Sequence, residues 1–301
     1  MGMKIFFGLL FLLLVVILLS FYWFIPLSNT EFISQFSSSD SILENNSGNL
    51  QFYENMRFPT SRISYHINNC SLQKKDDMLR AFEILSSKTI LNFYESNIPE
   101  ITIVCESKNK IEGGLFIAGE GGPVNITKAG EFNIITKGKI LLIKESSCPN
   151  PNIAIHELLH VLGFDHSSNP NDLMYAISKC DQEINPNVIN IINTLYSIPS
   201  YPDLAFENVS AVMKGKYMNI NISIRNKGFQ NAPYSQVLIY TDDKLVKTID
   251  FDPLVVGNGR VITLTNVWIS KISIDKVRLI IKADFEELKK RNNEIVLEGK
   301  K

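Results

Sequence analysis

One stretch of eleven residues decides the fold of this chain: His156-Glu157-Leu158-Leu159-His160-Val161-Leu162-Gly163-Phe164-Asp165-His166. On a helix, residues four apart share a face, so the imidazoles of His156 and His160 can reach one metal ion. Gly163 can take the left-handed conformation that ends a helix, and the chain can then turn back to bring His166 to that ion. Three histidines leave one coordination position for water, which is typical of a catalytic zinc site.

The alternative is that these are ordinary core or surface histidines. The chain holds only four histidines, and three of them fall in this window, which favours zinc. His66 lies alone in an expected strand and is interpreted as structural. Glu157 lies beside the ligands, where we expect it to act on metal-bound water as the catalytic base. Asp165 either supports the neighbouring ligand or faces solvent, and the sequence leaves both readings open.

The pattern HExxHxxGxxH resembles the signature of the metzincin zinc metalloproteases, in which a Met-turn follows. Asn171-Asp172-Leu173-Met174-Tyr175 supplies such a turn, and this turn and Ser167 both resemble the matrixin branch. The resemblance covers residues 58–199. It implies an α/β metzincin domain that hydrolyses polypeptides with one zinc ion, with Met174 as the floor beneath the ligands and Tyr175 lining the site.

The resemblance also extends upstream of the zinc motif. Residues 113–118 resemble the edge strand that pairs with substrate in this family. The resemblance implies that an extended substrate lies against Leu115, Phe116, Ile117 and Ala118, held by main-chain hydrogen bonds. Ala176 stands where the branch has proline, so the wall of the specificity pocket is expected to differ. Counterparts of the histidines for a second zinc are missing from the sequence, and calcium could bind carbonyls of the loop 119–122 but has no assigned ligands. The cysteine-switch motif is also missing.

The first thirty residues predict the compartment. Residues 5–25 are almost unbroken apolar sequence, long enough for a helix to cross a hydrocarbon core of about 30 Å. Lys4 precedes this run and no Lys or Arg follows until Arg57, which favours a cytoplasmic N-terminus and an exported remainder. We expect an uncleaved, single-pass transmembrane signal anchor in the cell membrane with an extracellular catalytic domain. The alternative is secretion after cleavage of a signal peptide.

The four cysteines fit an oxidising compartment. An even number of cysteines without a CxxC pair predicts disulfides rather than a metal cluster. Four cysteines allow three pairings, and we favour the sequential one, Cys70 with Cys105 and Cys148 with Cys180. N-x-S/T sequons that begin at five positions also fit an exposed exterior. They begin at Asn45, Asn69, Asn125, Asn208 and Asn221.

Composition along the chain predicts four segments. Residues 1–27 are the expected transmembrane anchor, and the Ser/Asn-rich residues 28–58 are read as a mostly flexible stalk. Residues 59–199 are the expected metallopeptidase domain, with strands at 62–68, 101–105 and 139–144 and helices at about 74–94 and from 151. In residues 200–301 the pattern changes to short alternating strands separated by turns, which predicts an all-β Ig-like sandwich.

The C-terminal segment is similar to the CARDB group of Ig-like domains of microbial surface proteins. The similarity rests on Pro202-Asp203-Leu204, on Arg225-Asn226-Lys227-Gly228, and on the ending that includes Arg291-Asn292-Asn293-Glu294. Such a domain implies a cell-surface ligand. We interpret Trp268 as a residue of the sandwich core.

Charge balance excludes one class of partner. Lys and Arg number 30 against 31 Asp and Glu, so the chain has no basic footprint for nucleic acid. The sequence therefore predicts a membrane-anchored, extracytoplasmic zinc endopeptidase. The alternative from another class is a surface adhesion or binding protein, in which the Ig-like domain carries the function and the zinc site is vestigial.

Overall fold

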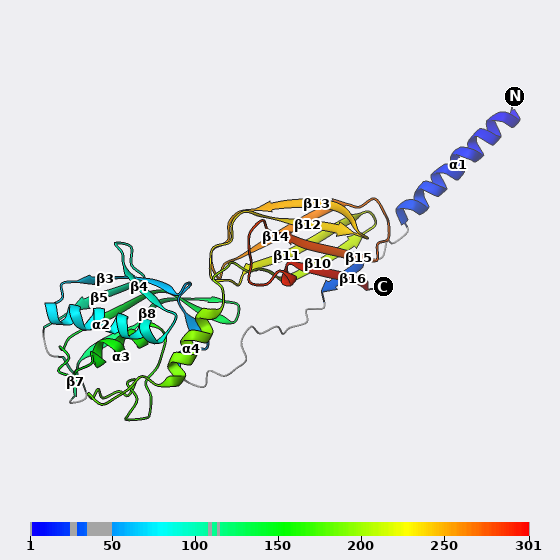
Figure 1. Ribbon diagram of the computed structural model, residues 1–301. Coiled ribbons are helices and arrows are strands. Elements are labelled where there is room, and N and C mark those ends of the chain that lie inside the picture. The colour runs from blue at the N-terminus through cyan, green and yellow to red at the C-terminus, as the bar shows by residue number, and fades with distance from the viewer. Residues whose placement is uncertain (1, 25–28, 35–49, 108–109, 113–114, 301) are drawn as a thin grey trace.

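The computed structural model describes residues 2–24, 29–34, 50–107, 110–112 and 115–300 (Figure 1). Helix α1 covers Gly2–Phe24, and its side chains are described for residues 6–19. In the described part of the chain, no helix is long and apolar enough to cross a membrane. Residues 1 and 25–27 of the predicted anchor, and residues 28 and 35–49 of the predicted stalk, lie outside the described residues.

The central domain is built on a mixed six-stranded sheet. The strands run in the order β2-β9-β5-β3-β4, and β8 pairs with the other side of β9. Every pairing on the main path is parallel, whereas β8 runs antiparallel to β9. The strands are β2 (Met56–Arg57), β3 (Arg62–Asn68), β4 (Asn92–Glu95), β5 (Ile101–Cys105), β8 (Gly119–Ala129) and β9 (Phe132–Leu142).

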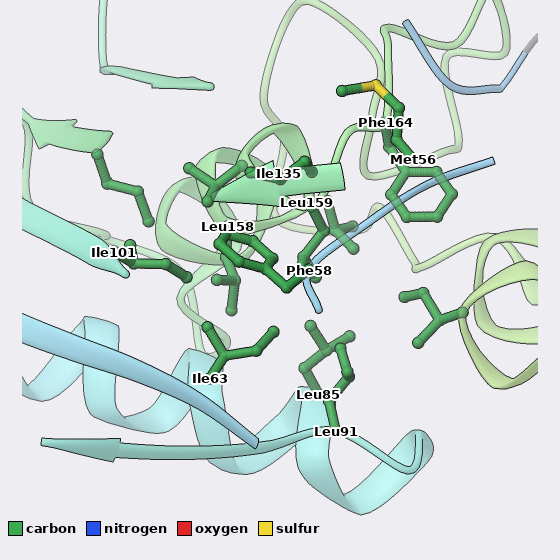
Figure 2. Packing of buried hydrophobic residues seen from close by; sticks show 14 of the residues in the cluster. Met56, Phe58, Ile63, Leu85, Leu91, Ile101, Ile135, Leu158, Leu159 and Phe164 are labelled. Atoms are coloured by element: carbon green, nitrogen blue, oxygen red, sulfur yellow. The ribbon is translucent and has the colours of Figure 1, made fainter. Parts of the chain in front are cut away.

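Three helices complete this domain: α2 (Leu72–Lys88), α3 (Asn152–Val161) and α4 (Pro186–Ser197). Helix α3, which carries the first two predicted zinc ligands, packs against α2, β8 and β9. Apolar side chains from the sheet, α2 and α3 form one core, in which Ile63, Leu85, Ile135 and Leu158 are fully buried (Figure 2). This core fixes the helix on which the site is built.

Helix α2 is shorter than the sequence predicts. Ser71 caps its N-terminus by accepting a hydrogen bond from the Lys74 N–H. The helix ends at Thr89, which is extended and whose N–H and hydroxyl both donate to the Leu85 carbonyl. Phe93 therefore lies on β4, from which it stacks on Phe82 of α2 instead of continuing the helix.

The C-terminal part is an all-β domain with its own core. Its eight-stranded antiparallel sheet runs β13-β12-β15-β16-β1-β10-β11-β14. The strands are β1 (Thr30–Ser34), β10 (Leu204–Lys214), β11 (Tyr217–Asn226), β12 (Ser235–Thr241), β13 (Lys244–Phe251), β14 (Gly259–Trp268), β15 (Lys276–Lys282) and β16 (Glu294–Lys300), with a short 3-10 helix at Arg291–Asn293. This arrangement confirms an all-β domain after the α/β domain.

The interpretation of residues 28–58 as a mostly flexible stalk misses three ordered parts. Strand β1 comes from this segment and lies between β10 and β16, with Phe32 buried in the core of the C-terminal domain. Strand β2 and the bridge between Gln51 and Phe164 belong to the central domain. Strand partners so distant in the chain leave no local signal.

The interpretation of Trp268 as a core residue is wrong, because its side chain is 60% exposed. Ile262 and Leu264 point inward from β14, and simple alternation would turn Trp268 inward as well. The register shifts between Met218 and Ile220 of β11, opposite Asn266, which has a φ of 56°. This bulge inverts the alternation, so that Val267 packs on the core and Trp268 faces outward.

The two domains share a joint built around Arg57. Its side chain is fully buried, and its guanidinium lies 4.7 Å from the Tyr196 ring centre and 4.0 Å from that of Phe229. The guanidinium also donates to the carbonyls of Leu195, Ile198 and Pro59. Phe229 comes from the C-terminal domain but packs in the core of the central one. Burial lowers the pKa of Arg57 to about 10.

Candidate active site

Three imidazoles converge at the C-terminal end of α3. The Nε2 atoms of His156 and His160 lie 3.0 Å apart, and that of His166 lies 3.3 Å and 3.2 Å from them. A tetrahedral zinc ion with Zn–N bonds of about 2.1 Å has ligand atoms about 3.4 Å apart. The predicted ligands therefore form a triangle of nearly the size that one face of a zinc tetrahedron requires, and they can hold a metal ion.

Backbone carbonyls orient two of these rings. The Nδ1 atom of His156 lies 2.7 Å from the Leu173 carbonyl, and that of His160 lies 2.8 Å from the Phe164 carbonyl. A carbonyl oxygen only accepts, so each Nδ1 carries the proton and each Nε2 presents its lone pair to the centre. Burial lowers the pKa of both rings, that of His160 to about 4, which keeps them in the neutral form that binds metal.

Gly163 makes the turn that brings the third ligand back. Its φ is 97°, as the sequence predicts for a left-handed helix end, and a Cβ there would lie 2.7 Å from the Cβ of Met56. The Phe164 N–H then donates to the Leu159 carbonyl and closes the helix. Asp165 accepts the His166 N–H at 2.7 Å. Asp165 is itself exposed, so it faces solvent while its carboxylate contacts the backbone of the ligand loop.

Glu157 points toward the same space from the same helix. Its side chain is buried, and burial followed by the charge of Glu120 raises its pKa to about 8. A glycine-bearing segment of β8 crosses directly over it. A Cβ on Gly119 would lie 2.8 Å from the Glu157 Cγ, and a Cβ on Gly121 would lie 2.3 Å from its carbonyl oxygen. The absence of side chains at these positions permits the close packing of strand and helix.

The predicted Met-turn lies beneath the histidines. Met174 is buried, and its carbonyl accepts the Ser167 N–H at 2.8 Å. Tyr175 follows it and is half-buried, but Ala176 rather than Tyr175 lines the groove. The turn thus supports the ligand loop, whereas the expectation that Tyr175 lines the site is not met, because the groove is lined by Ala176 and the residues after it.

The sequence interpretation assigned no role to Asp172. This carboxylate is buried, with Oδ1 accepting the Met174 N–H at 2.9 Å and Oδ2 accepting the Asn185 side-chain amide at 3.0 Å. Asn185 in turn caps the N-terminus of α4. Asp172 therefore holds the turn whose Leu173 carbonyl orients His156. An aspartate two residues before the turn methionine was the available signal, because Asp side chains bind backbone N–H groups two residues on.

A groove of about 740 Å³ runs past these groups. The three histidines and Glu157 lie along it, with residues 117–121 on one wall and residues 176–180 on another. Lys144, Glu145 and the disulfide Cys148–Cys180 also border it. The second disulfide, Cys70–Cys105, ties the start of α2 to the end of β5. The sequential disulfide pairing is confirmed.

The expected substrate strand is placed differently from the prediction. Leu115, Phe116 and Ile117 form β7 (Leu115–Ile117), which pairs with β6 (Lys110–Glu112) in a separate hairpin. Ala118 follows, and its carbonyl accepts the N–H groups of Ile143 and Lys144. In the described sheet, the outer strand beside Glu157 is β8, which begins at Gly119. The glycines within residues 119–122 had favoured a loop there, because glycine weakens a strand.

Comparison with known proteins follows the same division into two domains. Residues 57–197 match the family model Matrixin, and residues 201–296 match the family model CARDB. A search among curated proteins finds no match. The crystal structure of a CARDB domain from Pyrococcus furiosus, in complex with di-metal ions, is 19% identical with a TM-score of 0.26. The match covers 33% of this chain and 88% of the Pyrococcus furiosus chain. The chain therefore carries a matrixin-like domain followed by a CARDB-like domain.

Proposed function

We propose that the chain is a zinc-dependent endopeptidase whose site lies in the groove beside α3. The convergence of three Nε2 atoms next to a buried glutamate carries this proposal. His156, His160 and His166 would hold the ion. When bound, zinc supplies a Lewis acid that polarises the scissile carbonyl and acidifies water. Calcium stays without assigned ligands.

Glu157 performs the proton transfers in this proposal. Its carboxyl lines the groove together with the three imidazoles and comes from the same helix as His156 and His160, which suits a group that takes a proton from water and passes it to the leaving group. It takes the proton of the attacking water and delivers it to the nitrogen of the leaving amine. The burial of Glu157 under β8 keeps its carboxyl away from bulk water.

The polypeptide substrate binds in an extended form along β8. Residues 119–121 border the groove, and the close packing of Gly119 and Gly121 on α3 leaves a strand edge of main-chain groups there. Main-chain hydrogen bonds to such an edge bind peptides irrespective of sequence. Residues 176–180 on another wall would then select the side chain.

The Glu157→Gln variant tests the proposed function. Loss of a general base costs about 100-fold or more in rate, and we expect that loss in hydrolysis of casein or a peptide library. Zinc content should stay at one ion per chain, because Glu157 is no ligand. Glu83→Gln, on the exposed face of α2, is the matched control and should keep full activity.

Two results would contradict the peptidase. One is equal cleavage by wild type and Glu157→Gln, and the other is a purified chain without zinc. If neither protein cleaves any peptide, the alternative of a binding protein with a vestigial zinc site gains support. The cell-surface ligand of the C-terminal domain stays a prediction from the sequence.

We also propose that residues 5–25 anchor the chain in the cell membrane, with the catalytic domain outside. The apolar run in the sequence, the lack of Lys and Arg before Arg57 and the two disulfides support this. Resistance of the full chain to carbonate extraction is the expected result. A mature N-terminus after residue 27 would instead support secretion after signal cleavage.

A further inference from the structure

The outward-facing Trp268 belongs to a cluster at one end of the C-terminal domain. Its register partner on β11 is Tyr217, which is 54% exposed, and Tyr217 pairs in turn with Lys214 of β10. Partners in neighbouring strands point to the same face, so the two aromatic rings and the lysine form one row. Large apolar side chains gathered in this way need an explanation, whereas single ones do not.

The loop after β14 lies at the same end of the domain. Ile269 and Ile274 are buried and fix the loop to the core, whereas Ile272 at its tip is 65% exposed. The Ile269 N–H donates to the carbonyl of Lys216, which ties the loop to the β10–β11 turn. We call Tyr217, Trp268 and Ile272, together with Lys214 and Lys216, the Trp268 surface.

Two lysines lie on this surface. Lys214 and Lys216 are exposed beside the two aromatic residues. Of the acidic residues at this end, Asp242 pairs with Lys271 and Asp243 pairs with Lys276, whereas Glu31, the register partner of Val212, and Asp275 are exposed. Anionic groups of a partner would therefore meet two exposed lysines. Lysine with tyrosine and tryptophan is the combination found where proteins meet the headgroup layer of a bilayer.

The path of the chain indicates what the Trp268 surface contacts. Strand β1 begins at Thr30, whose register partner Met213 is next to Lys214. The polypeptide that follows α1 thus enters the domain at the end that carries the Trp268 surface. The other end of β10 begins at Leu204, close to the joint with the central domain. The 11 residues of β10 separate these ends by about 35 Å.

We propose that the Trp268 surface lies on a phospholipid bilayer that contains anionic lipids. This inference rests on the proposed membrane anchor, because α1 delivers the chain to this end of the domain. It goes beyond the anchor in assigning a second, peripheral contact to the C-terminal domain. That contact places the Trp268 end of the domain at the lipid and the joint with the central domain at the other end of β10, about 35 Å away.

The two tryptophans of the chain allow a direct test on the full-length protein. They are Trp23 in α1 and Trp268. The Trp23→Phe variant, reconstituted in vesicles of phosphatidylcholine and phosphatidylserine, reports on Trp268 alone. We expect its emission to shift to shorter wavelength relative to the detergent-solubilised protein, and brominated lipid to quench it. Trp268→Phe reports on Trp23 in the same vesicles.

A charge variant tests the headgroup contact. Lys216→Glu should weaken the quenching of Trp268 and its dependence on phosphatidylserine, with about a fivefold shift of the equilibrium per lysine removed. Lys282→Glu, near the opposite end of β15, is the matched control and should leave the quenching unchanged.

The outcomes separate the two proposals. Quenching of Trp23 without quenching of Trp268 would overturn the lipid contact and leave the anchor in place. Quenching of neither tryptophan would overturn both the anchor and the lipid contact. A blue shift of Trp268 that depends on protein concentration and not on lipid would show that a second copy of the chain covers the surface, and would also overturn the inference.

Discussion

At the scale of single residues, the zinc ligands are oriented by groups that the histidine motif does not contain. The Leu173 carbonyl holds His156 and the Phe164 carbonyl holds His160, and each fixes a proton on Nδ1. Leu173 is held in place by a turn that Asp172 closes. The geometry of the site therefore depends on a buried carboxylate outside the ligand set.

Asp172→Asn should weaken zinc binding although no ligand changes. In the variant, the side-chain oxygen of residue 172 can still accept the Met174 N–H. Its new NH₂ group, however, faces the NH₂ group of Asn185, and two hydrogen-bond donors oppose each other. Loss of such outer contacts costs about tenfold or more in metal affinity. Competition with a chelator measures it. Asp181→Asn, at an exposed position, should bind zinc like wild type, and equal affinity of both variants would contradict the role of Asp172.

The sequence predicted the ligands and Glu157 because this chemistry lies in one helix and one turn. It did not predict the full role of Asp172, since the position two residues before Met174 indicates only the bond to the Met174 N–H, and nothing local indicates the second partner, Asn185. The interpretation of Trp268 as a core residue was wrong for a different reason. A β-bulge at Asn266 reverses the face of the sheet toward which the following residues point. Residue type predicts burial only when the alternation is regular.

The start of β10 predicts a dependence of stability on pH. Burial raises the pKa of Asp203, although its carboxylate accepts the Asn292 amide at 2.9 Å. Between the ordinary and the raised pKa, the folded chain binds more protons than the unfolded chain, so the free energy of unfolding falls as pH rises. Acidification from neutral pH through the folded pKa should thus stabilise the wild type.

Asp203→Asn should remove this contribution. Its free energy of unfolding, measured with urea at neutral and mildly acidic pH, should gain less from acidification than that of the wild type. Asp284→Asn alters an exposed carboxyl and serves as the control. Equal gains in Asp203→Asn and the wild type would show that burial of Asp203 has no such cost.

At the scale of elements, the contact between β8 and α3 controls the shape of the groove. Gly121→Ala places a Cβ against the Glu157 backbone, so strand and helix must separate. Displacements of about 1 Å cost about 100-fold in rate, and we expect a loss of that order in peptide hydrolysis with zinc still bound. Gly122→Ala is the matched control, because its Cβ would meet open space. Equal activity of the two variants would contradict the contact.

The elements themselves were predictable to different degrees. Helix α3 and strands β3 and β5 follow from local patterns, and so does the alternation of β11. Strand β8 was read as a loop because its glycines are explained only by the helix beneath it. Strand β1 pairs with two strands near the far end of the chain, and no local pattern predicts such partners.

At the scale of the whole molecule, Arg57 joins the two domains. Arg57→Ala leaves several buried carbonyls without a donor and removes the cation between Tyr196 and Phe229. We expect a cost of about 3 kcal/mol in the free energy of unfolding. Calorimetry should then resolve separate transitions for the two domains. Arg57→Lys keeps the positive charge, so its free energy of unfolding should fall by less. An unchanged single calorimetric transition in Arg57→Ala would exclude Arg57 as the residue that joins the domains.

The position of β1 has a consequence for synthesis. Phe32 of β1 pairs with Ala211 of β10 and Gly299 of β16. Strand β1 is among the first segments to leave the ribosome, but it cannot form all of its strand pairs until β16, one of the last segments, has been synthesised. The central domain can fold while β1 is still unpaired, but the C-terminal sheet cannot close until translation is almost complete. A chain truncated before β16 would leave both β1 and β15 with an open edge, which is a site for aggregation. The order of the sheet thus makes completion of the chain a condition for its solubility.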